Sequence, residues 1–145
     1  MPRIYIAVDK QRAVIERADG RCEYCQSLMD YTTETFAVEH VIPLSRGGTN
    51  ELDNLALSCS GCNGHKDNKT EALDPADGKV VPLFNPRQQK WQTHFGWVDD
   101  YTHIIGLTPT GRATVEILRM NRIGLVNVRR LLYLIRQHPP KLNDI

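Results

Sequence analysis

Two cysteine pairs of identical spacing constrain this chain more than any other feature: Cys22 and Cys25 form the first pair, and Cys59 and Cys62 the second. Each pair can place two thiolates on one tetrahedral Zn²⁺ ion. Because four sulfur ligands leave no position for water or substrate, we expect the zinc to be structural. The gap between the pairs exceeds the roughly 15 to 20 residues of a zinc ribbon, so something else should be folded between them.

Other uses of the cysteines are less favoured. A redox pair is the main alternative, but the sequence has two such pairs and no thioredoxin-like βαβ pattern. The N-terminal segment MPRIYIAVDK lacks the long apolar region and small-residue cleavage site of a secretory signal, so we expect a cytoplasmic protein whose cysteines bind metal. No apolar run approaches the roughly 18 residues of a membrane helix, so we expect no membrane partner. A length of 145 residues suits one domain.

The residues between and just after the cysteine pairs carry the groups that phosphodiester hydrolysis requires. The reaction needs a base for water, a metal to neutralise charge on the phosphate, and groups that orient both. His40 is a candidate base, because a neutral imidazole accepts a proton near pH 7. Glu39 precedes it, and adjacent residues of a strand face opposite sides. The two therefore share a site only if the strand end twists or the site lies across that end.

The chain before residue 92 is expected to contain two helices and two strands. Asp9 is a candidate cap for a helix over 10–19 that Gly20 terminates. The other expected elements are strands over 32–38 and 55–58, a short helix over 60–69, and an extended connector with little regular structure over 71–91.

The C-terminal part is expected to contain a hairpin and two basic helices. Segments 92–98 and 101–107 alternate apolar and polar residues around Asp99 and Asp100, which favours a hairpin. Thr110 is a candidate cap for the first helix, and the second should span about 123–137. Residues 110–145 carry seven Lys and Arg against two Asp and Glu, whereas the rest of the chain is net acidic.

The pattern from Glu39 to Lys66 closely resembles the HNH endonucleases. The matching residues are Glu39-His40, Pro43, Gly47-Gly48, Asn54-Leu55, Cys59-x2-Cys62, Asn63 and Lys66. The resemblance implies an α+β fold with a small ββα-metal core held together by a four-cysteine zinc site, to which the hairpin and two helices are added as a C-terminal extension. We expect a core over 1–70 and an extension over 71–145, packed as a single domain.

The resemblance also implies roles for individual residues. His40 would be the general base, and Asn54 would hold the catalytic loop and orient the histidine. Glu39 and Asn63 would be the ligands of one catalytic Mg²⁺ or Mn²⁺. The family most often has Asp at the position of Glu39, and many members have His at that of Asn63. Both replacements supply oxygen ligands for a hard cation, with weaker binding expected from the amide.

Basic residues outside this cluster are candidate phosphate contacts. Lys66 and Lys69 lie three residues apart on the expected short helix, where they either face a phosphate or simply solubilise the surface. Arg112, Arg119 and Arg122 would share one helix face if the first C-terminal helix continued that far. The partner expected for these cations is DNA, and the alternative is a solvated helix face.

Two functions remain open at this point. The first is a metal-dependent HNH endonuclease that hydrolyses DNA with His40 as the base. The second is a non-catalytic zinc-stabilised module that binds nucleic acid or protein, in which His40 and the asparagines only satisfy loop backbone groups. A plasmid-cleavage assay with Mg²⁺ or Mn²⁺ and a His40→Ala variant distinguishes them.

Overall fold

The structure is a computed structural model that describes residues 5–141. It has the expected α+β composition, with three separate two-stranded antiparallel sheets. The elements in chain order are α1 (Val8–Arg17), β1 (Phe36–His40), β2 (Leu55–Cys59), α2 (Ser60–Lys66), β3 (Glu71–Leu73), β4 (Val80–Pro82), α3 (Trp91–His94), β5 (Phe95–Val98), β6 (His103–Gly106), α4 (Pro109–Ile117) and α5 (Ile123–Leu134). Short 3₁₀ turns span Met29–Tyr31, Leu44–Arg46 and Leu52–Asn54.

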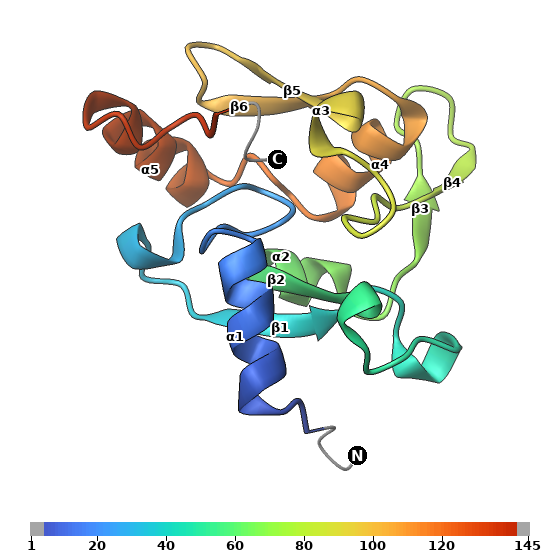
Figure 1. Cartoon of the computed structure of the whole chain (residues 1–145). Helices are drawn as coiled ribbons and strands as arrows, with labels where there is room; N and C mark the ends of the chain where they lie inside the picture. The colour runs from blue at the N-terminus through green and yellow to red at the C-terminus, as the bar shows by residue number, and fades with distance from the viewer. Residues whose placement is uncertain (1–4, 142–145) are drawn as a thin grey trace.

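The β1–β2 hairpin and α2 form a ββα unit, and α1 packs against the hairpin (Figure 1). In the pairing register Val38 lies opposite Leu57, and His40 lies opposite Leu55. Leu55 and Leu57 are fully buried against Val14 of α1. Because side chains alternate along a strand, Glu39 lies on the face away from α1, towards α2 and the first cysteine pair. The polar residues at the end of β1 therefore sit on a well-packed support.

The first helix begins earlier than expected. Ala7 occupies the N-cap position and no side chain caps the helix, so the prediction of Asp9 as the cap is wrong. Asp9 lies instead in the first turn, where its charge favours the positive end of the helix. The chain leaves the helix just before the predicted terminator: Asp19 already has φ of +54°, and Gly20 follows with φ of +66° and donates its N–H to the carbonyl of Ile15.

The two strands and the short helix of the core are confirmed with shifted ends. The first strand starts at Phe36 rather than near residue 32, since the Thr32 hydroxyl accepts from the N–H of Glu34 and forms a turn there. The helix stops at Lys66 because Asp67 adopts φ of +52°, a conformation that cannot continue it. Glu39 and His40 lie at the end of the strand as predicted.

The prediction of an irregular connector over 71–91 is wrong. Strands β3 and β4 form a short hairpin, and α3 begins at Trp91. The hairpin turn is held by Asp74, whose carbonyl accepts from the Gly78 N–H and whose carboxylate accepts from the Ala76 N–H. Three-residue strands are too short to show a periodic sequence pattern, so the turn residues were the only local signal of this hairpin.

The second hairpin and the two C-terminal helices are confirmed, but residues 92–94, expected in the first strand, belong to helix α3, and the strand β5 starts at Phe95. One cap also differs from the prediction. Thr108, not Thr110, is the N-cap of α4, because its hydroxyl accepts from the N–H of Gly111 and Pro109 then occupies the first helical position. The last helix ends at Leu134, three residues before the expected Gln137.

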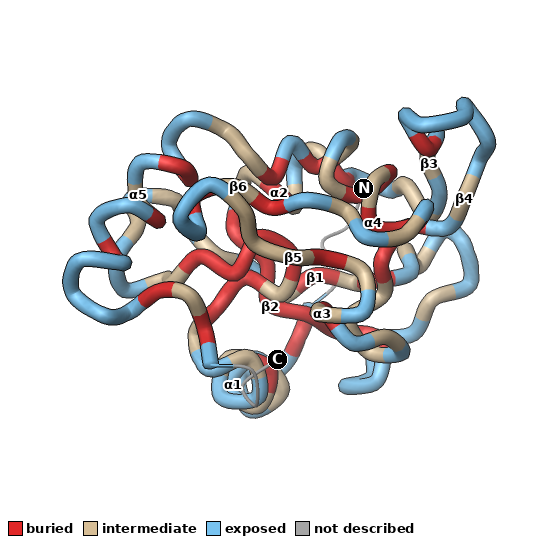
Figure 2. Tube along the Cα trace, turned by 90° about the horizontal axis from the view of Figure 1, so that it is seen from above, coloured by how far each residue is buried: buried red, intermediate tan, exposed pale blue. Residues whose placement is uncertain are grey.

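The main core draws on both halves of the chain. It contains the four cysteines and Tyr24 together with Phe84, Trp91, Phe95, Ile104, Leu118, Met120 and Leu125. Figure 2 shows the buried segments, in red, gathered mainly in the middle of the molecule, with exposed segments around them. The indole of Trp91 donates to the carbonyl of Tyr24 at 2.8 Å, which joins the extension directly to the first cysteine pair. A core shared by both halves of the chain is what a single packed domain would have. The division into a core and an extension at residue 70 stays a prediction. Within residues 5–141 no helix is long and apolar enough to cross a membrane.

Candidate active site and zinc centre

The four cysteines converge on one point in the core. Their sulfur atoms all lie within 4.8 Å of one another, and each cysteine is fully buried. Cys25 Sγ and Cys59 Sγ are 3.7 Å apart. A tetrahedral Zn²⁺ ion with bonds of about 2.3 Å needs sulfur atoms about 3.8 Å apart, so the donor set and its spacing fit zinc. The four thiols provide a possible metal site as the sequence predicts.

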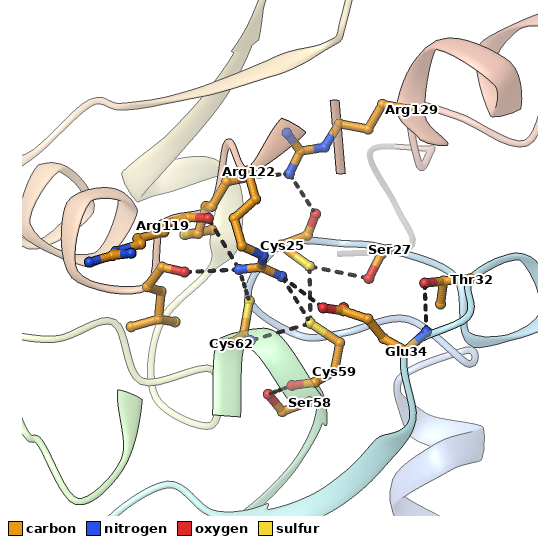
Figure 3. A network of polar contacts seen from close by, with 12 residues as sticks. Cys25, Ser27, Thr32, Glu34, Ser58, Cys59, Cys62, Arg119, Arg122 and Arg129 are labelled. Atoms are coloured by element: carbon orange, nitrogen blue, oxygen red, sulfur yellow. Dashed lines mark hydrogen bonds and ion pairs between the residues drawn. The ribbon is translucent and has the colours of Figure 1, made fainter. Parts of the chain in front are cut away.

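Arg122 covers one side of this thiol cluster (Figure 3). Its Nη2 lies 3.6 Å from Cys59 Sγ, and its Nη1 lies 3.8 Å from Cys62 Sγ. Nη2 is also 3.6 Å from Oε1 of Glu34. Four thiolates around a divalent ion carry a net charge of −2, and this guanidinium supplies a positive charge beside two of them. Arg122 therefore ties the segment between α4 and α5 to the four-cysteine cluster.

Glu39, His40 and Asn63 line one open groove at the end of β1. The groove has a volume of about 410 Å³, and Asp67, Asn68 and the loop residues Pro43 and Leu44 complete its wall. Glu39 and His40 leave β1 on opposite faces, but the groove runs across the strand end and reaches both. Asn63 joins from α2, whose first turn follows directly from β2. Residues separated in the sequence thus meet at one surface.

Glu39 is buried and has two partners. The hydroxyl of Tyr24 donates to its Oε1 at 2.5 Å, and Nζ of Lys66 lies 3.9 Å from its Oε2. Burial raises the pKa of Glu39 to about 7, although the Lys66 ammonium and the Tyr24 hydroxyl both oppose this shift. Burial thus favours the protonated form of this carboxyl, so a cation that binds Glu39 competes with a proton.

His40 contacts Asn50 of the loop that follows β1. The distance from His40 Nε2 to Asn50 Oδ1 is 2.9 Å. His40 remains partly exposed to the groove. Asn63 has no side-chain hydrogen bond to any residue that the structure describes, so its amide oxygen is free to accept a ligand. The groove therefore presents an imidazole, a carboxyl and an amide in one place.

Asn54 fixes the loop between the two strands of the core. Its Oδ1 accepts from the Ile42 N–H at 2.9 Å, and its Nδ2 donates to the carbonyls of Ile42 and Thr49 at 2.9 and 2.8 Å. Gly48 has no room for a side chain, because a Cβ there would lie 1.8 Å from the carbonyl oxygen of Ile42. The side chain of Asn54 thus acts on the loop backbone and not directly on the imidazole of His40.

Three of the predicted phosphate contacts have partners inside the protein. Lys66 is only 2% exposed, and its ammonium donates to the carbonyl of Val41 at 2.8 Å in addition to facing Glu39. Arg112 forms a two-bond pair with the buried carboxylate of Asp74, at 3.0 and 2.8 Å. Arg122 is occupied at the thiols. These three cations serve internal contacts instead.

Arg119 and Lys69 remain accessible. The prediction that Arg119 shares a helix face with Arg112 and Arg122 is wrong, since α4 ends at Ile117 and Arg119 has φ of +49°. Arg119 is exposed, and Lys69 is half-buried. Lys69 lines a second cavity of about 500 Å³ beside the groove. Their roles as phosphate contacts stay predictions.

Sequence reasoning missed two residues at this site. Tyr24 lies inside the first cysteine pair, and Asn50 lies in a polar loop where asparagine is common. Neither side chain has a local pattern that indicates its partner, because Tyr24 meets Glu39 and Asn50 meets His40 only after the hairpin has folded. The position of Tyr24 between two predicted zinc ligands was the one signal in the sequence.

Comparison with known proteins identifies part of the chain. Residues 22–69 match the family described as HNH endonuclease. This segment is an HNH domain. The HNH domain contains both cysteine pairs as well as the groove residues Glu39, His40 and Asn63, and it ends just beyond α2.

Similarity to a curated protein extends over most of the chain. The chain is 26% identical over 123 residues to the Septu protein PtuB of Bacillus thuringiensis. The aligned region covers 83% of this chain and 44% of that protein, so the chain spans less than half the length of this curated relative. No solved structure matches the chain.

Proposed function

We propose that this chain is a metal-dependent endonuclease that hydrolyses DNA phosphodiester bonds. The observation that carries the proposal is the convergence of Glu39, His40 and Asn63 on one groove within the HNH domain. An imidazole base, a carboxyl and an amide oxygen are the groups that activation of water and binding of a hard cation require. The groove is open, so a strand of nucleic acid can reach it.

His40 serves as the general base in this proposal. A neutral imidazole in the groove takes a proton from water as the water attacks phosphorus, while the bond from phosphorus to the leaving sugar oxygen breaks and that oxygen takes a proton from solvent. Proton transfer to a base of this kind contributes about 10²- to 10⁴-fold in rate. Asn54 holds the loop after β1 through three hydrogen bonds to its backbone. The loop in turn fixes the wall of the groove in which the phosphate must lie.

Glu39 and Asn63 are the proposed ligands of one Mg²⁺ or Mn²⁺ ion. Both present oxygen atoms to the groove, which suits a hard cation that keeps several waters. These two residues would hold the cation where its positive charge would stabilise the phosphate oxygens in the transition state. Tyr24 and Lys66 position the Glu39 carboxyl and favour its ionised form. The zinc bound by the four cysteines has a structural role.

A plasmid-cleavage assay tests the proposal. The full chain, purified with zinc, is incubated with supercoiled DNA and either Mg²⁺ or Mn²⁺. We expect cleavage that EDTA abolishes and that His40→Ala reduces by at least about 100-fold. Asn63→Ala should raise the metal concentration needed for half-maximal rate. Cleavage by His40→Ala at the wild-type rate would refute the assigned base, and DNA binding without cleavage in any metal would favour the non-catalytic zinc module.

A further inference from the structure

Asn50 presents an acceptor, not a donor, to the imidazole of His40. Its Oδ1 lies 2.9 Å from His40 Nε2, and its Nδ2 donates to the carbonyl of Tyr5 at 3.3 Å. The opposite orientation of the amide would place Oδ1 against the Tyr5 carbonyl oxygen, where two acceptors repel each other. The hydrogen-bond partners therefore determine which end of the amide faces the histidine.

This orientation determines the tautomer of His40. An amide oxygen only accepts hydrogen bonds, so Nε2 of the neutral imidazole must carry the proton. Nδ1 is then the ring nitrogen that holds the lone pair, and a general base acts through its lone pair. The opposite tautomer would place the Nε2 lone pair against Asn50 Oδ1 and leave the base nitrogen protonated.

Contacts from other parts of the chain hold Asn50 and the residue before it in place. Nζ of Lys10 in α1 donates to the backbone carbonyl of Asn50 at 2.9 Å. The preceding carbonyl, that of Thr49, accepts from Nδ2 of Asn54 at 2.8 Å. The N-terminal segment contributes a third contact through Tyr5. A residue fixed in this way can hold an imidazole in one orientation, whereas a free surface asparagine cannot.

We propose that Asn50 is a positioning residue that holds His40 as the Nε2–H tautomer and leaves Nδ1 as the base. This inference rests on the proposed function, because it assigns a role in activating water. A neutral amide suits such a role because it orients the ring without the negative charge of a carboxylate, which would stabilise the protonated imidazole.

Nitrogen NMR of the imidazole tests the tautomer without any measurement of activity. The zinc-loaded protein, free of DNA and Mg²⁺, is labelled with ¹⁵N, and the His40 signals are assigned by their loss in His40→Ala. We expect the pattern of an Nε2–H tautomer in the wild type and a tautomeric mixture in Asn50→Leu. Asp53→Asn, an exposed change in the same loop, is the matched control and should leave the His40 signals unchanged.

Cleavage kinetics test the positioning role. Asn50→Leu should lower kcat by about 10- to 100-fold and leave KM within about twofold, since the base is misaligned while the DNA-binding surface remains. Asn50→Asp keeps the acceptor, so it should retain more activity than Asn50→Leu. Glu39 and Asp67, the titratable neighbours in the groove, are unchanged in both variants.

The results separate this inference from the proposed function. An Nδ1–H tautomer in the wild type, or identical His40 signals in wild type and Asn50→Leu, would overturn the role of Asn50 even if cleavage depends on His40. Equal losses of activity in Asn50→Leu and Asn50→Asp would also overturn it, because only one of them lacks the acceptor. Wild-type cleavage by His40→Ala would refute the catalytic function while leaving the tautomer measurement valid.

Discussion

The hydroxyl of Tyr24 donates a 2.5 Å hydrogen bond to Oε1 of Glu39. Tyr24 lies between Cys22 and Cys25 in the sequence, and Glu39 lines the candidate catalytic groove. The candidate metal site of the four cysteines and the candidate catalytic carboxyl are therefore connected by one side chain. The ring of Tyr24 is almost completely buried, so it has little room to move by itself. A change in the first cysteine pair should therefore also disturb the carboxyl of Glu39.

Tyr24→Phe should destabilise the fold by about 1–3 kcal/mol, the usual effect of removing one partner of a buried hydrogen bond to a charged group. It should also favour the protonated form of Glu39, because the hydroxyl helps to hold the pKa of that carboxyl down. Urea unfolding at equal zinc content measures the stability. Tyr31→Phe, at a half-exposed tyrosine, is the control and should change the free energy of unfolding by less than about 0.5 kcal/mol.

Lys66→Met tests the buried ion pair with Glu39. Methionine has about the same volume as the apolar part of the Lys66 side chain. The substitution therefore removes only the ammonium, which faces Oε2 of Glu39 and the carbonyl of Val41. Breaking one partner of a buried pair costs about 3 kcal/mol, and protonation of Glu39 should lessen the loss at low pH. Thermal unfolding of the zinc-bound protein at pH 8 and pH 5.5 measures both effects.

Lys69→Met is the matched control for this change. It removes the same charge three residues away, from a side chain with no buried carboxylate partner among the described residues. We expect no more than about 0.5 kcal/mol of destabilisation. If Lys69 contacts DNA, this variant should weaken DNA binding at low salt while Lys66→Met, correctly folded, should not. Equal stability of the two variants would show that the buried pair contributes nothing.

Arg122→Gln should accelerate loss of zinc. The guanidinium lies beside the sulfur atoms of Cys59 and Cys62, and its removal leaves the net negative charge of a zinc tetrathiolate without this compensation (Figure 3). We expect zinc release to a chromophoric chelator to become about tenfold faster, the effect of losing roughly 1.5 kcal/mol. Arg119→Gln, at an exposed arginine in the same segment, should release zinc at the wild-type rate.

The local patterns of the sequence predicted the parts of the site that lie close together along the chain. The cysteine spacing indicates the metal site because a CxxC pair can bind through its own turn. Likewise Glu39 and His40 were correctly placed at a strand end, since apolar residues precede them and Pro43 follows. The ββα order of the core follows from such local signals.

Contacts between distant segments were beyond these patterns. Arg112 resembles a DNA-binding residue in the sequence, but Asp74 neutralises it in the folded chain. Arg122 was expected on a helix face that does not exist, because α4 ends at Ile117. The sequence of a basic segment gives its charge, but it does not reveal which carboxylates and thiols will lie against that segment in the folded protein. The same reason explains why Asn50 could not be linked to His40.

The stability of the folded protein should depend on pH through His138. Its Nε2 donates to the carbonyl of Tyr101 at 2.7 Å, and its ring packs edge-on against Trp97. Burial lowers the pKa of His138 from 6.5 to about 4, and the positive charge of Arg129 adds to this effect. Because the folded protein binds the proton more weakly than the unfolded chain, the stability is fully present above about pH 6.5 and is lost as the pH falls towards 4.

His138→Gln should remove this pH dependence, because an amide can also donate to the Tyr101 carbonyl but does not titrate in this range. Between pH 7 and pH 5 the wild type should lose on the order of 2 kcal/mol more stability than the variant. Urea unfolding at a fixed zinc concentration measures the difference, and the protonation of Glu39 and of the cysteines is common to both proteins and cancels. Parallel pH profiles for the two proteins would mean that His138 binds a proton equally well in the folded and unfolded states.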